Sequence, residues 1–495
     1  PFFNDRATTV IYTLSVHDAL PIWRARALPT PMNIQFDETN LLAGVVGQAN
    51  GVTPKEVKDG RKRALDALAA FRKQSESGAY GFPHLPFQTK LIQSVRAYAE
   101  SVRGSFDTVC LVGIGGSALG AWALDCGLRG PHPVQPAFGP ANPRLVVLDN
   151  VDPMFVGAAL DSMNPRRTLV LVVAKSGGTA ETVAAYLIVR QWLHAALGRK
   201  AAQRVVAVTT EGKGDLAALA EREGYRAFPI PENVGGRFSV LSAVGLLPAA
   251  LVGIDIRKLT RGAAAMTHRC WQPDLDENPA LRAALYHWLV WTRRSKPIQV
   301  AFPYSNRLWG AAFWFRQLWA ESLGKARTRQ GELVNVGQTP VAALGSTDQH
   351  SQVQLYIEGP NDKMFTFWAL EKFSNPGSIP REKLGLPAFD ALAGASLHEL
   401  IDAERRATAA AMVANGRPNC TFTLGRMDEE HLGAFLQLLE FETAFMGELL
   451  DINAFDQEGV ELGKKFTFGL MGRQGYEQYR DQFAAYEKKR AAARK

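Results

Sequence analysis

Two loops in this chain combine the residue types that hold an anion. Residues 113–117 (Gly-Ile-Gly-Gly-Ser) follow one apolar run, and residues 174–182 (Ala-Lys-Ser-Gly-Gly-Thr-Ala-Glu-Thr) follow another. Glycine lets the backbone approach a ligand closely, and amides and hydroxyls at the start of a helix donate to a negative group. The second loop in particular predicts a site for a phosphate monoester.

The first loop on its own leaves two kinds of ligand open. Its glycines would suit a dinucleotide, although the third glycine of that fingerprint is absent at the required spacing, or a small molecule that carries a phosphate. The second loop lacks the Gly-Lys-Ser/Thr of a Walker A loop, and its simplest alternative is an ordinary N-capping turn. Two such loops on neighbouring strands favour a ligand over a cap.

Three further segments contain groups that move protons or stabilise charge. Arg237 follows a glycine pair, Gln317 and Glu321 lie four residues apart on one face of a predicted helix, and His350 leads into a predicted strand. A carboxylate and an imidazole are common general acid–base groups. Taken singly, Glu321 also fits a solvated helix residue and His350 a capped loop histidine.

Strand-length apolar runs place both loops at one edge of a predicted sheet. Each run is rich in Val or Leu without polar alternation, which is typical of strands buried on both faces, and helical stretches separate the runs. The alternation predicts a parallel α/β sheet, in which ligands bind beyond the carboxyl ends of the strands. The predicted strands of this half are Thr108–Val112, Arg144–Leu148, Thr168–Val173 and Arg204–Val208.

The alternation resumes after a helical bridge at about 256–294. Strands are expected at Ile298–Phe302, Gln352–Glu358, Met364–Ala369 and Asn419–Leu424, and long helices at Arg307–Ser322, Leu397–Asn415 and Glu429–Asp451. A C-terminal helix at about 475–493 is expected to pack across both halves. The expected division is 1–31 as an N-terminal extension, 32–104 as a helical segment, 105–265 and 266–450 as two tandem α/β domains, and 451–495 as a C-terminal segment with a basic tail.

Composition excludes several classes of protein. The 495 residues are 46% apolar and 21% charged, unlike a disordered, collagenous or disulfide-scaffold protein. Four scattered cysteines fit neither a disulfide framework nor a zinc cluster, and they indicate a reducing cytoplasm. The net charge of +8 does not predict a nucleic-acid partner, because five of the positive charges lie in residues 488–495 and form a solvated tail. No apolar segment is long enough to predict a membrane span.

Residues 1–31 differ in texture from the rest of the chain. Residues 1–22 show no sustained hydrophobic period and look like translated adapter sequence, and Pro29 and Pro31 mark a break before Met32. We therefore expect Met32 to be the natural start and the preceding segment to lie outside the fold. A targeting presequence is the alternative.

Two long motifs give the chain a resemblance to a known family. Residues 233–242 (Asn-Val-Gly-Gly-Arg-Phe-Ser-Val-Leu-Ser) and 453–464 (Asn-Ala-Phe-Asp-Gln-Glu-Gly-Val-Glu-Leu-Gly-Lys) resemble the two signatures of the bacterial type of the glucose-6-phosphate isomerase family. The loops at 113–117 and 174–182 match that family in order and place, and the similarity runs from about Met32 to the C-terminus.

The resemblance implies a fold and an activity. The fold is α/β, with two tandem sugar-isomerase (SIS) domains, each a five-stranded parallel sheet flanked by helices. The activity is the reversible isomerisation of glucose 6-phosphate and fructose 6-phosphate through ring opening and a cis-enediolate, in glycolysis and gluconeogenesis. A homodimer in the cytoplasm is implied, and no cofactor or metal.

The resemblance also implies a role for each matching residue. Glu321 is the base that moves a proton between C1 and C2, and Arg237 stabilises the enediolate. His350, donated across the dimer interface, and Lys464 open the sugar ring. The residues implied to bind the substrate are Gly116, Ser117, Ala174, Lys175, Ser176, Gly177, Gly178, Thr179, Thr182, Gln317 and Gln457.

One position departs from the family pattern, and other functions stay open. Ala174 stands where the family often has Ser, so its backbone is available but a hydroxyl is missing. A non-catalytic sugar-phosphate sensor would need neither Glu321, His350 nor Lys464. An isomerase that also acts on mannose 6-phosphate and a nicotinamide dehydrogenase are the remaining alternatives.

Overall fold

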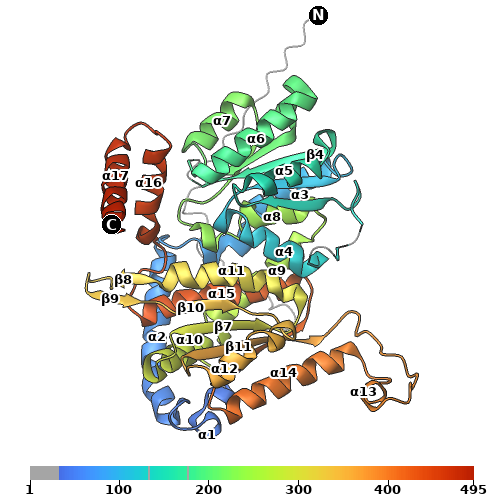
Figure 1. Cartoon of the computed structure of the whole chain (residues 1–495), viewed down its shortest axis with the longest axis vertical. Coiled ribbons are helices and arrows are strands. Elements are labelled where there is room, and N and C mark those ends of the chain that lie inside the picture. Colours follow the sequence, from blue (N-terminus) through green and yellow to red (C-terminus); the bar gives the residue numbers. More distant parts are fainter. Residues whose placement is uncertain (1–32, 132–133, 136, 176–177, 495) are drawn as a thin grey trace, which may run out of the picture.

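The computed structural model describes residues 33–131, 134–135, 137–175 and 178–494. Two β-sheets lie one above the other, with a layer of helices between them (Figure 1). One continuous hydrophobic cluster contains side chains from both sheets and from these helices. The expected N-terminal extension, Ser176 and Gly177 fall outside the described residues.

The first sheet has five strands in the order β3-β2-β4-β5-β6, and all of its pairs are parallel, as predicted. Side chains of its buried strands alternate between two cores: Val109 and Leu111 face the shared cluster, whereas Cys110 and Val112 face the outer helices. The strands are β2 (Thr108–Val112), β3 (Arg144–Leu148), β4 (Thr168–Val173), β5 (Val205–Thr209) and β6 (Arg226–Pro229), and the outer helices are α5 (Pro153–Asp161), α6 (Ala180–Leu197) and α7 (Asp215–Glu223).

The second sheet also has five strands, but it is not wholly parallel as expected. Its order is β1-β12-β11-β7-β10, and β1 (Ile34–Asp37) runs antiparallel to β12 (Asn419–Arg426). The segment before the first long helix thus supplies an edge strand, and an antiparallel strand at the edge of a parallel sheet is a common arrangement. The other strands are β7 (Ile298–Pro303), β10 (Thr339–Ala342) and β11 (Lys363–Lys372); β8 (Lys325–Arg327) and β9 (Leu333–Val336) form a separate antiparallel pair.

The predicted strand Gln352–Glu358 is wrong, because this segment forms the short helix α12 (Val353–Glu358). Its apolar residues alternate as they would in a strand, yet only Tyr356 is buried and Leu355 is 54% exposed. The strand position beside β7 is taken instead by β10. Short apolar runs do not distinguish a strand from a helix by periodicity alone.

Most of the long helices contribute to the shared cluster. They are α2 (Pro54–Glu76), α3 (Thr89–Ser101), α4 (Leu119–Arg129), α8 (Ala243–Leu251), α9 (Ile256–Cys270), α10 (Pro279–Arg294), α11 (Asn306–Leu323) and α15 (Glu429–Leu449). The outer face of the second sheet is covered by α12 and α14 (Leu397–Ala414), and α1 (Ala43–Val46) and α13 (Pro387–Asp390) are single turns. Among the helices of the described ranges, none is long and apolar enough to cross a membrane.

The C-terminal segment forms a helical hairpin of α16 (Glu461–Leu470) and α17 (Glu477–Ala492), seen as a separate red pair at the side of the molecule (Figure 1). The two helices approach closely at Gly469, where a Cβ would lie 2.7 Å from the backbone nitrogen of Arg480. No residue of α17 is buried. The expectation that this helix packs across both halves is therefore wrong, because α17 lies against α16 and buries none of its residues.

Candidate functional site

The glycine loop after β2 packs against a turn that carries Arg237. A Cβ at Gly116 would lie only 2.2 Å from the carbonyl carbon of Gly236, so the two backbones can approach this closely because residue 116 is glycine. The hydroxyl of Ser239 donates to the carbonyl oxygens of Gly236 at 2.6 Å and of Gly116 at 3.3 Å. Arg237 is thereby fixed beside the glycine loop that follows the carboxyl end of β2.

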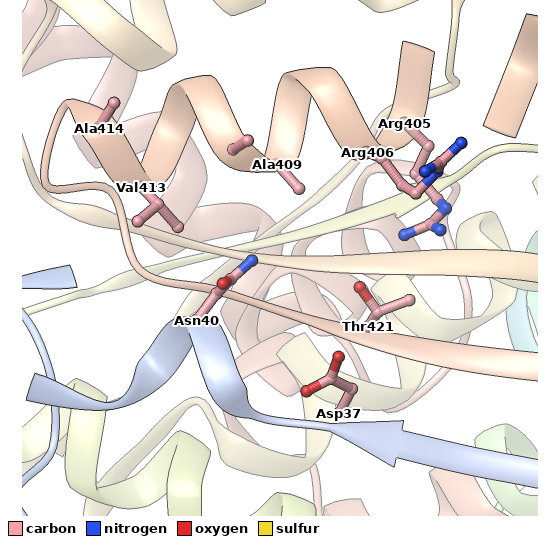
Figure 2. A pocket seen from close by; sticks show the side chains of 9 residues that line it. Asp37, Asn40, Arg405, Arg406, Ala409, Val413, Ala414 and Thr421 are labelled. Carbon is pink, nitrogen blue, oxygen red and sulfur yellow. The ribbon is translucent and has the colours of Figure 1, made fainter. Parts of the chain in front are cut away.

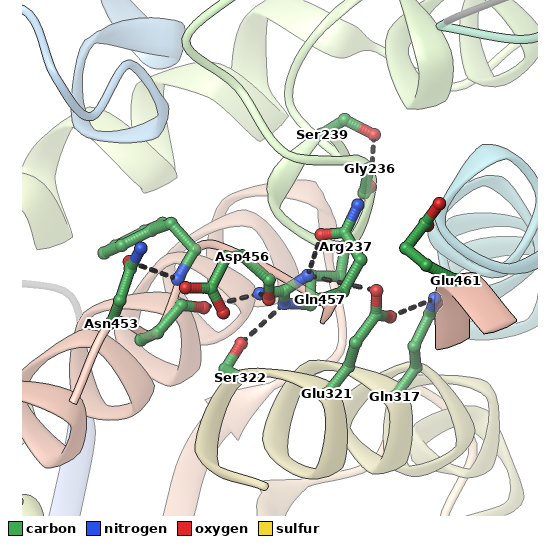
Figure 3. Close-up of polar contacts among 12 residues, drawn as sticks. Gly236, Arg237, Ser239, Gln317, Glu321, Ser322, Asn453, Asp456, Gln457 and Glu461 are labelled. Atoms are coloured by element: carbon green, nitrogen blue, oxygen red, sulfur yellow. Dashed lines mark hydrogen bonds and ion pairs between the residues drawn. The ribbon is translucent and has the colours of Figure 1, made fainter. Parts of the chain in front are cut away.

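Arg237 is the centre of a polar cluster that joins three distant parts of the chain (Figure 3). Its Nε donates to Ser322 Oγ at 2.7 Å, and its Nη1 donates to Glu321 Oε1 and to Gln457 Oε1, each at 3.1 Å. A guanidinium presents five donors in a rigid fork, so these contacts define its orientation.

Backbone carbonyls of the loop before α16 complete the set of acceptors. Nη2 of Arg237 donates to the carbonyl oxygens of Ala454 at 2.5 Å and Asp456 at 2.9 Å. The side chain of Arg237 is 2% exposed. This burial lowers the pKa of Arg237 from its usual value, whereas the negative charges of Glu321 and Asp456 act in the opposite direction.

The Glu321 carboxylate is held on both oxygens. Oε1 accepts from Arg237, and Oε2 accepts from Gln317 Nε2 at 2.9 Å. Gln317 and Glu321 lie one turn apart on α11, which is the spacing that lets two helical side chains meet. A Cβ at Gly115 would be 2.9 Å from Gln317 Nε2, so the glycine loop also borders this pair. The Glu321 side chain is 27% exposed, which leaves room for a ligand beside it.

Lys325 and Asp456 belong to the site although the sequence did not predict them. Lys325 Nζ donates to the carbonyl oxygens of Glu321 at 2.9 Å and Asp456 at 2.7 Å, and lies 3.0 Å from Asp456 Oδ1. Burial lowers the pKa of Lys325. A lysine just past the end of a helix often binds the last free carbonyls, and this was the available signal. The contact with Asp456 joins residues 131 positions apart, and no local pattern in the sequence predicts it.

Lys175 has a different role from a free phosphate ligand. Its Nζ donates to the carbonyl oxygens of Glu232 at 2.7 Å and Val234 at 2.9 Å, and burial lowers its pKa. The ammonium thus ties the loop after β4 to the segment that leads to Arg237. The Thr209 hydroxyl donates a hydrogen bond to the carbonyl oxygen of Ala174 at 2.7 Å.

The rest of the second loop leads into α6. Thr179 is the residue before the first turn of this helix, and within the described residues its hydroxyl makes no capping bond. Thr182 is buried, and Gly178 precedes the helix. The predicted ligands Ser176 and Gly177 lie outside the described residues, and Ser117 ends the turn of the glycine loop.

Lys464 and His350 do not contact this cluster in the described part of the chain. Lys464 is half-exposed on α16, and its Nζ lies 2.8 Å from Glu461 Oε1. Helix α16 begins four residues after Gln457, so Lys464 stands close along the chain to a ligand of Arg237. His350 ends an exposed turn, 347–350, after β10.

The turn that carries His350 lies at the opposite end of α11 from Glu321. The backbone nitrogen of Gly345 donates to the Pro303 carbonyl at 2.9 Å, which fixes this loop near the start of α11. Asn306 and Glu321 are 15 residues apart along the helix, or about 22 Å. One chain therefore brings together Arg237, Gln317, Glu321 and Gln457, but not His350.

A separate cavity lies elsewhere in the molecule. It has a volume of about 440 Å³ between α14 and the β1 edge of the second sheet (Figure 2). None of the predicted site residues lines it, and its two arginines, Arg405 and Arg406, are paired with Asp402 at 2.8 and 2.9 Å. Four of its nine lining residues are Ala or Val, and the other five are polar or charged.

The cluster around Arg237 is suited to proton transfer with stabilisation of an anion. A carboxylate with fixed geometry can accept a proton, and a buried guanidinium beside it can stabilise negative charge that develops on the reacting molecule. No group of three or more His, Cys, Asp or Glu side chains in the described ranges is arranged to hold a metal ion.

Comparisons with known proteins agree with this chemistry. The family model described as phosphoglucose isomerase matches residues 88–483, a range that includes every site residue named above. A glucose-6-phosphate isomerase from Carboxydothermus hydrogenoformans is 43% identical over 432 residues, which cover 86% of this chain and 92% of that protein.

Two solved structures are similar over most of the chain. The crystal structure of a hypothetical protein from Thermus thermophilus has a TM-score of 0.79 and 38% identity, covering 88% of this chain and 99% of that one. A glucose-6-phosphate isomerase from Chlamydia trachomatis has a TM-score of 0.70 and 25% identity, covering 81% of this chain and 76% of that one.

Proposed function

Because this chain belongs to the phosphoglucose isomerase family, we propose that it catalyses the reversible isomerisation of glucose 6-phosphate and fructose 6-phosphate. The observation that carries the proposal is the 3.1 Å contact between Glu321 Oε1 and Arg237 Nη1, with Gln457 on the same guanidinium nitrogen. A base and a cation held together in this way are what an aldose–ketose isomerase requires.

Glu321 is the base in this proposal. Its carboxylate removes the proton from C2 of the open-chain aldose, and the electron pair of that C–H bond forms the C1–C2 double bond while negative charge develops on O1. The proton then returns from Glu321 to C1, the hydroxyl proton of O2 passes to O1, and the carbonyl forms at C2. The bonds from Gln317 and Arg237 support this role, because they keep the carboxylate in one plane beside both carbons.

Arg237 stabilises the cis-enediolate. Its charge is fixed by five acceptors on the protein, so it needs no rearrangement when negative charge develops on the sugar oxygens. Its burial supports the role further, because electrostatic interactions are stronger away from water. Gln457 lines the same edge of the site.

The phosphate takes no part in bond making and serves to hold the reacting end in place. We place it between the glycine loop, with Gly116 and Ser117, and the start of α6, with Gly178, Thr179 and Thr182. The N-terminus of an 18-residue helix favours an anion, and the Thr179 hydroxyl, which makes no capping bond among the described residues, supports this position. Lys175 and Ala174 contribute their backbone, while Ser176 and Gly177 remain assigned by the family motif alone.

His350 and Lys464 open the pyranose ring, with His350 supplied by the second subunit of a homodimer. Ring opening takes a proton from the C1 hydroxyl and gives one to the ring oxygen, which suits an imidazole with an ammonium neighbour. Glu321 lies about 22 Å along α11 from Asn306, near which the turn of His350 is held. This separation supports a shared site, because the two residues of one chain do not meet.

The reaction places the protein in glycolysis and gluconeogenesis, and we propose that it works in the cytoplasm. The four cysteines, all buried and free of disulfides, support a reducing compartment.

A coupled assay tests the proposed function directly. Fructose 6-phosphate is supplied with EDTA present, and the appearance of glucose 6-phosphate is measured, because no step requires a metal. We expect turnover with this substrate, and mannose 6-phosphate run in parallel separates a dual-specificity enzyme. A folded protein that does not turn over fructose 6-phosphate would overturn the proposal.

A further inference from the structure

The phosphate of the proposed substrate is close to a dianion at neutral pH, and the ammonium of Lys175 in the second loop is directed at carbonyl oxygens of the protein. Both described acceptors of Lys175 Nζ are carbonyl oxygens, those of Glu232 and Val234, and the side chain is half-buried. The glycines and threonines of the two loops bring hydrogen-bond donors but no charge. A second cation near the start of α6 would therefore strengthen the binding of this anion considerably.

Arg473, in the turn between α16 and α17, lies at this place. Its Nη1 is 3.9 Å from the position that a Cβ would take at Gly178, so the guanidinium reaches the described end of the phosphate loop. The C-terminal hairpin, which buries nothing through α17, thus contacts the protein where the anion is expected.

Two aromatic rings hold the guanidinium in this position. Its central carbon lies 4.5 Å from the ring centre of Phe468 and 5.4 Å from that of Tyr476. Cation–π contacts of this kind restrict an arginine without using its N–H donors. In the described part of the chain no side chain or carbonyl accepts a hydrogen bond from these donors, and no carboxylate pairs with them. The other arginine of the turn region, Arg480, has Asp481 at 3.6 Å.

We infer that Arg473 binds the substrate's phosphate group, as a further binding residue supplied by the C-terminal hairpin. The inference rests on the proposed function and extends it. The hairpin would then act on both ends of the sugar phosphate, since α16 also carries Lys464. Arg473 would act on binding alone, because the phosphate takes no part in the reaction.

The variant Arg473→Gln tests this role in the full chain. KM for fructose 6-phosphate should rise about tenfold, since the variant loses a charge-assisted hydrogen bond that exposure to water already weakens. The value of kcat should stay within twofold, because uniform binding is lost and no transition-state contact is removed. The inhibition constant of inorganic phosphate should rise by a similar factor.

Arg480→Gln is the matched control, because it removes the same charge from the same hairpin at an exposed ion pair. It should leave KM and the phosphate inhibition constant within twofold of wild type, and Arg473→Lys should restore most of the affinity. The inference is overturned if Arg473→Gln changes both constants no more than Arg480→Gln does. If Arg473→Gln lowers the melting temperature, the phosphate inhibition constants of Arg473→Lys and Arg473→Met are compared at a temperature where both are folded. A constant that rises only in Arg473→Met supports the inference, and equal constants in the two variants overturn it. If the wild-type protein turns over fructose 6-phosphate, a negative result with the Arg473 variants counts against the role of Arg473 and not against the proposed function.

Discussion

Arg237 shows how single residues create a reactive site in this protein. Arg237 is only 2% exposed, and burying a guanidinium this deeply would be costly in free energy without partners. Every one of its donor groups has an acceptor. Only one of the acceptors, Glu321, is a carboxylate in direct contact, so the arginine keeps positive potential toward the substrate side. The same contact orients Glu321, so one ion pair positions both the proposed base and the proposed cation.

At Glu321, substitution by Gln removes the proton acceptor while keeping the shape of the side chain. Turnover should fall by at least about 10²–10⁴-fold, the range for a lost general base, whereas inhibition by inorganic phosphate should be unchanged. The coupled assay and a phosphate titration measure the two effects. Glu221→Gln, at an exposed carboxylate on α7, is the control and should be fully active. Near-normal turnover of Glu321→Gln would make Glu321 a surface residue.

Lys325→Met tests whether the bridge between Glu321 and Asp456 positions the catalytic pair. The methionine keeps the apolar stem but removes three contacts of the ammonium, at 2.7–3.0 Å. We expect kcat to fall about 10- to 100-fold with KM changed less than threefold, because the contacts hold the loop that binds Arg237 rather than the substrate.

Lys325→Arg is the companion variant, since it retains the charge and donors, and part of the lost kcat should return. Kinetics and the free energy of unfolding are measured together. Equal losses of kcat in both variants, or a loss of stability with unchanged kcat, would show that Lys325 is only structural.

At the scale of elements, the strands that the sequence predicted correctly have continuous apolar runs, and all of them except the edge strand β3 lie in the middle of a sheet. The missed strands of the two five-stranded sheets, β1, β6 and β10, are four residues each and lie at sheet edges, where one side needs no partner and few apolar residues are required. Helix α12 was assigned as a strand for the related reason that its apolar residues alternate over a short run. Length and burial, which depend on the tertiary structure, decide such cases.

The site follows the same division between local and distant information. Arg237 and Gln457 lie in the two motifs that resemble family signatures, and Glu321 lies one helical turn after Gln317, so local patterns point to all three. Lys325 and Asp456 could not, because their role comes from a contact between segments 131 residues apart. Lys175 was correctly placed in the loop, but its carbonyl partners depend on the packing of the 232–234 segment.

Helix α15 contains a carboxyl group that makes the stability of the protein depend on pH. Glu440 is fully buried, and neither carboxyl oxygen has a hydrogen-bond partner among the described residues. Burial raises the pKa of Glu440 well above 4.5. The folded state therefore keeps a proton that the unfolded chain loses above about pH 4.5, and stability falls by about 1.4 kcal/mol per pH unit until the folded-state pKa is reached.

Glu440→Gln removes this proton linkage with little change of shape. The variant should be more stable than wild type at pH 7–8, and the difference should disappear below about pH 4.5. Urea unfolding at several pH values measures it. On the same helix, Glu448→Gln should instead destabilise the protein at pH 7, because Glu448 is buried and paired with Arg329 at 2.5 Å. A wild-type stability that rises between pH 5 and 8 relative to Glu440→Gln would contradict the account.

At the scale of the whole molecule, one chain keeps Glu321 and the turn that carries His350 at opposite ends of α11. The shared hydrophobic cluster holds both sheets in a fixed relation, so the turn with His350 stays at the start of α11 and Glu321 stays at its end. A rigid core of this kind does not let the two residues approach within a chain. If both act on one substrate, the second must come from another copy, and closed two-fold dimers are the commonest way to supply it.

Complementation between two inactive variants tests the shared site. Glu321→Gln and His350→Ala chains, each with a different affinity tag, are co-expressed, and the mixed dimers are isolated by both tags. Each homodimer should be nearly inactive, because every site carries a lesion. In a mixed dimer one site receives both lesions and the other receives neither, so about half of the wild-type activity per dimer should return.

A tandem-tagged Glu321→Gln dimer gives the background. If purified mixed dimers remain inactive although each variant is folded and dimeric, Glu321 and His350 act from the same chain, and the separation along α11 must then close by a rearrangement of the second sheet's loops.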